Sequence, residues 1–194
     1  MTFNLLNYIN ESRSNLESLF TREFEDNFAS AGDYMVDSLS HGGSILVAGN
    51  GGSHSDAQHF SGELVNKFSR EHKALRVLTL GTNTSVATAW SNDFDFESQF
   101  SREVQAYGDK DSVFFGITTS GKSQNISIAL AEAKKIGMKT IVLTSYAGQE
   151  ALKPAADIVL SVPGDRTNKI QESHIVVYHA LCIYIESKLP NWLL

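Results

Sequence analysis

Apolar residues recur at helical spacing through the first forty positions of the chain. Polar and acidic residues fill the gaps, so the pattern predicts amphipathic helix over residues 1–40. The stripe consists of Leu16, Phe20, Phe24, Phe28, Ala31, Met35 and Leu39. More apolar residues precede it, namely Phe3, Leu5, Leu6, Tyr8 and Ile9. We expect part of this surface to cover the core of its own chain. The rest could cover the same core or pack on another subunit.

After His41 the pattern changes to five short apolar runs with helix-like segments between most of them. The runs are Ser44–Asn50, Ala74–Leu80, Ser112–Thr118, Lys139–Ser145 and Asp157–Val162. Alternating strand and helix predicts a parallel sheet that is covered on both faces. The expected fold class is α/β, with a doubly wound, flavodoxin-like five-stranded sheet and N-terminal helices. A last helix is predicted from about Gln171 to Lys188. We expect a single domain over 1–194, with a helical part over 1–40 and an α/β sandwich over 41–194.

Composition narrows the class of protein. The 194 residues are 42% hydrophobic and 20% charged, as in globular domains, and the net charge of -6 argues against a nucleic-acid partner. Cys182 is the only cysteine, which excludes an internal disulfide and fits a reducing compartment. No apolar run approaches the roughly 20 residues that span a membrane, and the first residues lack a signal-peptide pattern. We therefore expect a cytoplasmic protein without a membrane partner.

Two polar loops follow the first and third predicted strands, where doubly wound sheets bind ligands. The first loop is rich in glycine, which lets its backbone approach a ligand closely; its candidate residues are Asn50, Gly51, Gly52 and Ser53. The second loop offers hydroxyl groups suited to phosphate oxygens, from Thr118, Thr119, Ser120 and Ser123. Neither loop matches the P-loop or dinucleotide patterns. Either loop alone could be a turn with a helix cap, but two together favour a ligand site.

Candidate acid–base groups lie on two predicted helices. His59 and Glu63, four residues apart, share one helix face, which suits a metal pair or an acid and a base. Such pairs are also common on surfaces. The last helix adds His174 and His179, of which one could be an ordinary half-buried residue.

Four segments resemble the phosphoheptose isomerases of the sugar isomerase (SIS) domain family. They are AGNGGSHSDAQHFSGEL, SNDFDFESQFSREVQAYG, GITTSGKSQNI and KIQESHIVVYHALCIYIE. The resemblance covers almost the whole chain, and the four motifs in this order are specific. It implies an enzyme that converts sedoheptulose 7-phosphate to D-glycero-D-manno-heptose 7-phosphate through an enediol, the first step of ADP-heptose and lipopolysaccharide core biosynthesis. It also implies a homotetramer with active sites between subunits and a phosphorylated seven-carbon sugar as ligand.

The resemblance also implies roles for individual residues. Glu63 matches the general base, and His179 matches the partner acid or base. One zinc ion (Zn2+) per subunit is implied at His59, Glu63, Gln171 and His179. Because eight residues of continuous helix would separate Gln171 from His179 by about 12 Å, both reach one ion only if the helix starts after Gln171 or if they serve different sites. We predict that Gln171 lies at or just before the N-terminus of that helix. Substrate phosphate is implied at Ser53, Thr118, Thr119, Ser120 and Ser123. Asn92 and Asp93 fall in a segment that lines the site.

The chain departs from the family pattern at two positions, and two other functions are weighed against the isomerase. Lys67 and Asn168 stand where some members have Arg and Asp, and lysine lacks the guanidinium fork that can bind sugar hydroxyls. The same fold also hosts a non-enzymatic regulator that binds the replication initiator protein. The presence of Glu63 and His179 favours the isomerase over that regulator. A dinucleotide-dependent oxidoreductase is disfavoured, because no GxGxxG follows a strand.

Overall fold

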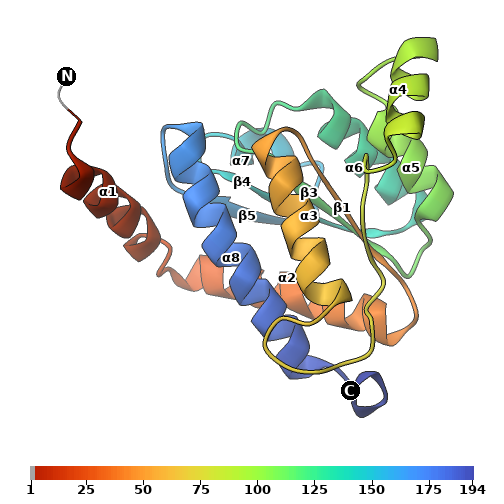
Figure 1. Ribbon diagram of the computed structural model, residues 1–194, viewed down its shortest axis with the longest axis horizontal. Coiled ribbons are helices and arrows are strands. Elements are labelled where there is room, and N and C mark those ends of the chain that lie inside the picture. The colour runs from red at the N-terminus through yellow and green to blue at the C-terminus, as the bar shows by residue number, and fades with distance from the viewer. Residues whose placement is uncertain (1–2) are drawn as a thin grey trace.

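The computed structural model describes residues 3–194 and shows helices packed on both faces of one sheet (Figure 1). The five strands are β1 (Ile45–Gly49), β2 (Val77–Thr79), β3 (Val113–Ile117), β4 (Lys139–Ser145) and β5 (Ile158–Val162). All pairs are parallel, in the order β2-β1-β3-β4-β5. This confirms the predicted α/β, flavodoxin-like class. β2 is shorter than predicted because it is an edge strand that pairs with only the first three residues of β1.

Eight α-helices surround the sheet within the described residues. They are α1 (Leu5–Glu17), α2 (Arg22–Ser40), α3 (Gly52–Val65), α4 (Thr84–Asp93), α5 (Gln99–Tyr107), α6 (Gln124–Ile136), α7 (Gln149–Leu152) and α8 (Thr167–Lys188). One apolar core joins α2, α3 and α8 to one face of the sheet. A second core joins α5, α6 and α7 to the other face. Figure 1 shows α3 and α8 side by side over the first face.

The N-terminal stripe forms two helices and not one. α1 ends at Glu17, and α2 begins after Thr21, whose side chain accepts a hydrogen bond from the backbone N–H of Phe24. Such a cap satisfies a helix N–H group and marks a new start. Phe20 lies in this break and is 83% exposed, whereas Phe24 and Phe28 pack on the core. No residue of α1 is fully buried: Leu16, near its end, packs against the core, whereas Leu5, Leu6 and Ile9 are exposed.

The last helix begins at Thr167, so the prediction that Gln171 lies at its N-terminus is wrong. The extra turn is held by polar contacts with α1. Lys169 Nζ, on a fully buried side chain, donates to the backbone oxygen of Tyr8 at 2.9 Å and to Glu172 Oε2 at 2.9 Å. Asn168 donates to the hydroxyl of Tyr8 at 2.8 Å. These contacts join segments far apart in sequence, so no local pattern could reveal them.

The topology brings the two polar loops together. β1 and β3 are neighbours in the sheet, and Gly49 at the end of β1 is paired in register with Ile117 at the end of β3. The chain winds in opposite directions from these two strands, which is the point where doubly wound sheets bind ligands. Within residues 3–194, no helix is long and apolar enough to cross a membrane.

Candidate active site

The first loop leads from β1 into α3. Gly51 has φ +55°, a conformation that glycine adopts without strain. Ser53 is buried in the first turn of α3. A cavity of about 270 Å³ lies against this loop, with Asn50 and Gly51 on one wall and Phe96 and Gln99 on another. The backbone of the loop is therefore open to a small ligand.

The second loop leads from β3 into α6. The hydroxyls of Thr118 and Ser123 lie 3.1 Å apart, and the Ser120 hydroxyl accepts a hydrogen bond from the N–H of Lys122. Ser123 is the N-cap residue of α6, yet its side chain accepts no hydrogen bond from the backbone N–H groups of the first turn. The free N–H groups of a helix N-terminus attract anions. A Cβ on Gly121 would lie 2.4 Å from the backbone oxygen of Gly148, so this turn is tightly packed.

A pair of amides joins the two loops. Asn50 Nδ2 donates to Asn125 Oδ1 at 2.9 Å, and Asn125 Nδ2 donates back to Asn50 Oδ1 at 2.8 Å. Asn125 lies in the first turn of α6 and is buried. Sequence reasoning did not select Asn125, although it lies two residues after the predicted phosphate loop. The two candidate loops thus form one surface.

The predicted acid–base groups meet beside the C-terminal half of α3. One ligand atom each from His59, Glu63 and His179 lie within 4.8 Å of one another. His59 Nε2 lies 2.9 Å from Glu63 Oε1, and the two imidazole rings are 4.9 Å apart, edge to face. Glu63 and His179 therefore share one site, although α3 and α8 are more than a hundred residues apart in the chain.

Burial shapes the protonation of this cluster. Desolvation lowers the pKa of His179, nearby His59 lowers it further, and Glu63 opposes both effects. His179 is therefore neutral at neutral pH, and a neutral imidazole can bind a metal or accept a proton. One turn before His59, burial raises the pKa of Asp56 to about 6, with Tyr178 and His59 opposing the shift.

The donor set of this cluster fits a divalent metal. Two imidazoles and one carboxylate are the protein ligands of many catalytic zinc sites, which leave a position open for substrate. His179 Nε2 is buried and has no hydrogen-bond partner among the described residues. A buried polar atom without a partner is costly, and a metal would satisfy it. His59, Glu63 and His179 could therefore hold an ion.

Three predicted site residues lie away from this cluster. The Gln171 amide packs against Gly52, since a Cβ there would lie 2.2 Å from Gln171 Nε2. Gly52 precedes His59 by seven residues, roughly 10 Å along the helix, so Gln171 lies with the first loop. Asn92 and Asp93 end α4, at a corner of the molecule away from α8, where they are exposed and bonded to each other (Figure 1).

Comparison with known proteins places this arrangement in a family. A sequence profile of the SIS domain matches residues 7–145. The chain is 46% identical over 152 residues to the phosphoheptose isomerase of Helicobacter pylori (strain P12), covering 78% of this chain and 79% of the relative. The chain belongs to the phosphoheptose isomerase family of SIS domain proteins.

Solved structures support the same assignment. A phosphoheptose isomerase from Francisella tularensis is 36% identical with a TM-score of 0.84, covering 96% of this chain and all of that one. The enzyme from Neisseria gonorrhoeae is 34% identical with a TM-score of 0.83, covering 94% and 96%. As a member of the phosphoheptose isomerase family, the chain is an isomerase.

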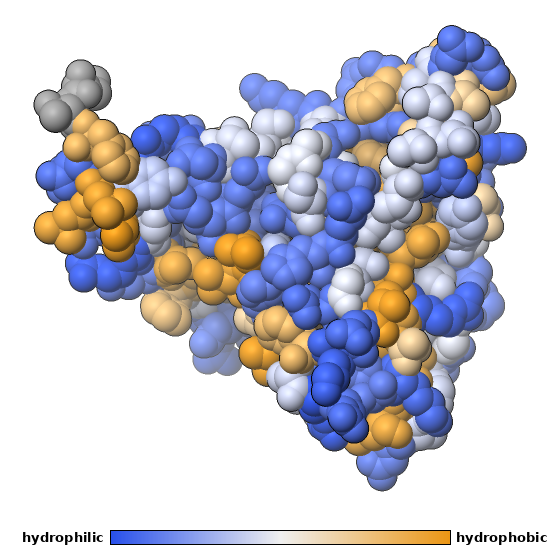
Figure 2. Space-filling view, viewed as in Figure 1, coloured by the Kyte–Doolittle hydropathy of each residue, from blue (hydrophilic) through white to orange (hydrophobic). Residues whose placement is uncertain are grey.

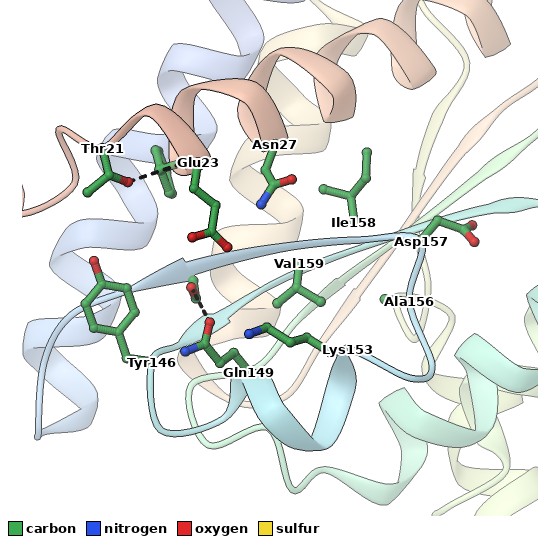
Figure 3. Close-up of a pocket in the computed structure, with 12 residues that line it drawn as sticks. Thr21, Glu23, Asn27, Tyr146, Gln149, Lys153, Ala156, Asp157, Ile158 and Val159 are labelled. Atoms are coloured by element: carbon green, nitrogen blue, oxygen red, sulfur yellow. Dashed lines mark hydrogen bonds between the residues drawn. The ribbon is translucent and has the colours of Figure 1, made fainter.

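This isomerase has a further cavity on the α7 side of the second loop. It has a volume of about 470 Å³ and lies along β5, between the start of α2 and α7 (Figure 3). Thr21, Glu23 and Asn27 face it from one side, and Gln149 and Lys153 from the other. None of the predicted site residues lines it.

Proposed function

We propose that this isomerase converts sedoheptulose 7-phosphate to D-glycero-D-manno-heptose 7-phosphate through an enediol. This would be the first step of ADP-heptose and lipopolysaccharide core biosynthesis, in the cytoplasm. The observation that carries the proposal is the meeting of Glu63 with two imidazoles, His59 and His179, within 4.8 Å. The names of the relatives support the substrate class.

Each group has a task in this reaction. The Glu63 carboxylate takes a proton from C1 of the ketose, the electrons of the C–H bond form the C1–C2 double bond, and the π electrons of the C2 carbonyl move to O2. The His179 imidazole moves a proton from O1 to O2 through the enediol, and Glu63 returns its proton to C2 as the C1 carbonyl forms. The hydroxyls of Thr118, Ser120 and Ser123 and the N-terminus of α6 would bind the phosphate and fix the sugar in place.

We also propose that each subunit binds one zinc ion through His59, Glu63 and His179. A bound zinc ion would supply a Lewis acid that polarises the substrate carbonyl. Because a metal-bound carboxylate is a weaker base, Glu63 acts as the base only when its carboxylate is free of the metal. The amide of Gln171 lies at the opposite end of α3 from Glu63, beside Gly52. A contribution from Gln171 to the metal would therefore have to come from another subunit.

We also propose that the protein forms a homotetramer with active sites between subunits. Glu63 follows Gly52 by eleven residues, roughly 16 Å along α3, which separates the first loop of a chain from its own acid–base cluster. The side chains of Leu5, Leu6 and Ile9 on α1 are 60%, 66% and 53% exposed, and Figure 2 shows apolar surface gathered over this helix. Apolar surface of this kind marks an interface between chains.

The test is direct. Purified protein with added zinc is incubated with sedoheptulose 7-phosphate, and the aldose product is followed by NMR. Product should appear with wild-type protein, and removal of the metal with a chelator should lower the rate. A folded, metal-loaded protein that forms no aldose would refute the substrate assignment. Unchanged turnover after removal of the metal would refute the catalytic role of zinc.

A further inference from the structure

The carboxylate of Glu186 collects four hydrogen bonds from one short segment. Glu186 lies near the C-terminus of α8 and is fully buried. It accepts from the backbone N–H of Phe68 at 2.7 Å, from that of Ser69 at 2.8 Å and from the Ser69 hydroxyl. His72 Nε2 lies 3.1 Å from the same carboxylate, and the His72 side chain is also fully buried. One side chain thus organises the whole turn.

The segment that Glu186 holds has no regular structure of its own. Residues 66–76 connect α3 to β2 without a helix or a strand. Backbone N–H groups outside helices and strands need other partners, and here the carboxylate supplies them to Phe68 and Ser69. Arg70 adds a bond to the backbone oxygen of Glu186 at 3.2 Å. The position of this segment therefore depends on α8.

The segment places an aromatic ring on the acid–base cluster. The ring of Phe68 lies 5.1 Å from that of His179, inclined by 32°. The same imidazole meets His59 at 4.9 Å. Phe68 also packs on the main core, which fixes its own orientation. The ring therefore limits the rotation of His179 and keeps water from one side of it.

One helix, α8, links this anchor, the Glu186 carboxylate, to the imidazole of His179. Glu186 follows His179 by seven residues on α8, two turns on the same helix face. We propose that Glu186 is a positioning residue of the active site, whose carboxylate fixes the Phe68 segment so that the Phe68 ring holds His179 toward Glu63. The inference rests on the proposed function in giving His179 a part in proton transfer.

The anchor needs a carboxylate. An ionised carboxylate only accepts hydrogen bonds, so it can satisfy two N–H groups, a hydroxyl and an imidazole at once. Burial alone would raise the pKa of Glu186, but hydrogen bonds from Ser69 and Phe68, with His72 nearby, hold this pKa below its usual range. An amide at this position would turn its NH2 group toward one of the donors.

The first test uses kinetics. Glu186→Gln and Phe68→Leu should each lower kcat by about tenfold to a hundredfold, the scale of a misplaced catalytic group. KM should stay within about twofold, because the phosphate loop lies on other elements. The matched control is Asp157→Asn, which alters another carboxylate that accepts a backbone N–H and a hydroxyl, both from Thr140. A similar loss of kcat in the control, or kcat within twofold of wild type in Glu186→Gln, would overturn the proposal.

The second test needs no substrate and is independent of the proposed reaction. In metal-free full-length protein with labelled histidine, the ring-proton resonance of His179 is assigned by its loss in His179→Gln. Phe68→Leu removes the ring current and should shift this resonance. Glu186→Gln should shift it in the same direction, and Asp157→Asn should leave it in place. An unmoved His179 resonance in Glu186→Gln would refute the anchor even if the enzyme is active. If Glu186→Gln does not fold, an unmoved resonance in Phe68→Leu would still refute the proposal.

Discussion

The hydroxyl of Tyr178 lies 2.9 Å from Nδ1 of His59, while Nε2 of the same ring lies 2.9 Å from Glu63 Oε1. Tyr178 is fully buried in the core beneath the cluster. A hydrogen bond at one imidazole nitrogen fixes the tautomer and the direction of the other. The orientation of the His59 ring is therefore set by a residue of the buried core, Tyr178.

Replacing Tyr178 with phenylalanine should weaken metal binding. The change removes the partner of His59 Nδ1 and leaves the ring in place, and loss of such a partner costs about tenfold to a hundredfold in metal affinity. Competition with a chromophoric chelator measures the dissociation constant. Tyr184→Phe is the control. Tyr184 lies on the same helix as Tyr178, but its hydroxyl donates to Asp33 on α2. Equal affinities in the two variants would contradict the role of Tyr178.

Glu63→Gln should remove most isomerase activity with little loss of stability. A general base contributes about a hundredfold to ten-thousandfold to the rate, and an amide cannot take the C1 proton. The contact of Glu63 with His59 is a partly exposed i,i+4 pair, which adds little to folding. Turnover and thermal melting are compared with Glu71→Gln, an exposed carboxylate paired with Lys67. Substantial activity in Glu63→Gln would exclude it as the base.

The amide pair between the loops gives a prediction about substrate binding. Asn125→Ala leaves the amide of Asn50 without its partner across the crevice. Loss of a partner for a part-buried amide costs about 1–3 kcal/mol, so the loops should separate and KM should rise about tenfold or more. Steady-state kinetics measure this, with Gln124→Ala, an exposed neighbour, as control. A fall in kcat with unchanged KM would show that the pair serves the chemistry instead.

The strands of the sheet could be predicted from the sequence, but the boundaries of the surrounding helices could not. Strands such as Ile45–Gly49 are buried on both faces, so their apolar runs are continuous and visible. The start of α8 depends on Lys169 and its contacts with Tyr8, which are invisible to a local pattern. The break before α2 did carry a local signal, because Thr21 is a good N-cap residue followed by Glu23 and Glu25.

The site was predictable in part for similar reasons. The i,i+4 spacing was enough to place His59 beside Glu63. The meeting of Glu63 with His179 followed from the family resemblance alone, since no local pattern links α3 to α8. Phe68, in the connection after α3, and Tyr178, in the middle of α8, were missed because aromatic residues usually serve the core. Only the fold reveals that they also contact imidazoles.

The exposed face of α1 should control assembly. Changing Leu5, Leu6 and Ile9 together to serine removes apolar surface that no residue of the same chain covers, so it should lower the mass of the assembly. Light scattering coupled to gel filtration measures that mass. A matched triple variant, Asn10, Arg13 and Ser14 to alanine, alters exposed polar positions of the same helix. An unchanged mass in the serine variant would show that subunits meet elsewhere.

His174 should make the protein sensitive to acid. Its ring is buried, and neither nitrogen has a hydrogen-bond partner within residues 3–194. Burial lowers the pKa of His174 from 6.5 to about 4, with the nearby backbone of Thr144 opposing the shift. Between these values the unfolded chain binds a proton that the folded chain does not, so stability falls as the pH falls from 6.5 toward 4. The loss amounts to about 3 kcal/mol. Denaturant unfolding at pH 7.5 and 4.5 should show a smaller difference for His174→Gln than for wild type. His41→Gln, an exposed histidine, should keep the wild-type difference; an undiminished difference in His174→Gln would assign the acid sensitivity to other groups.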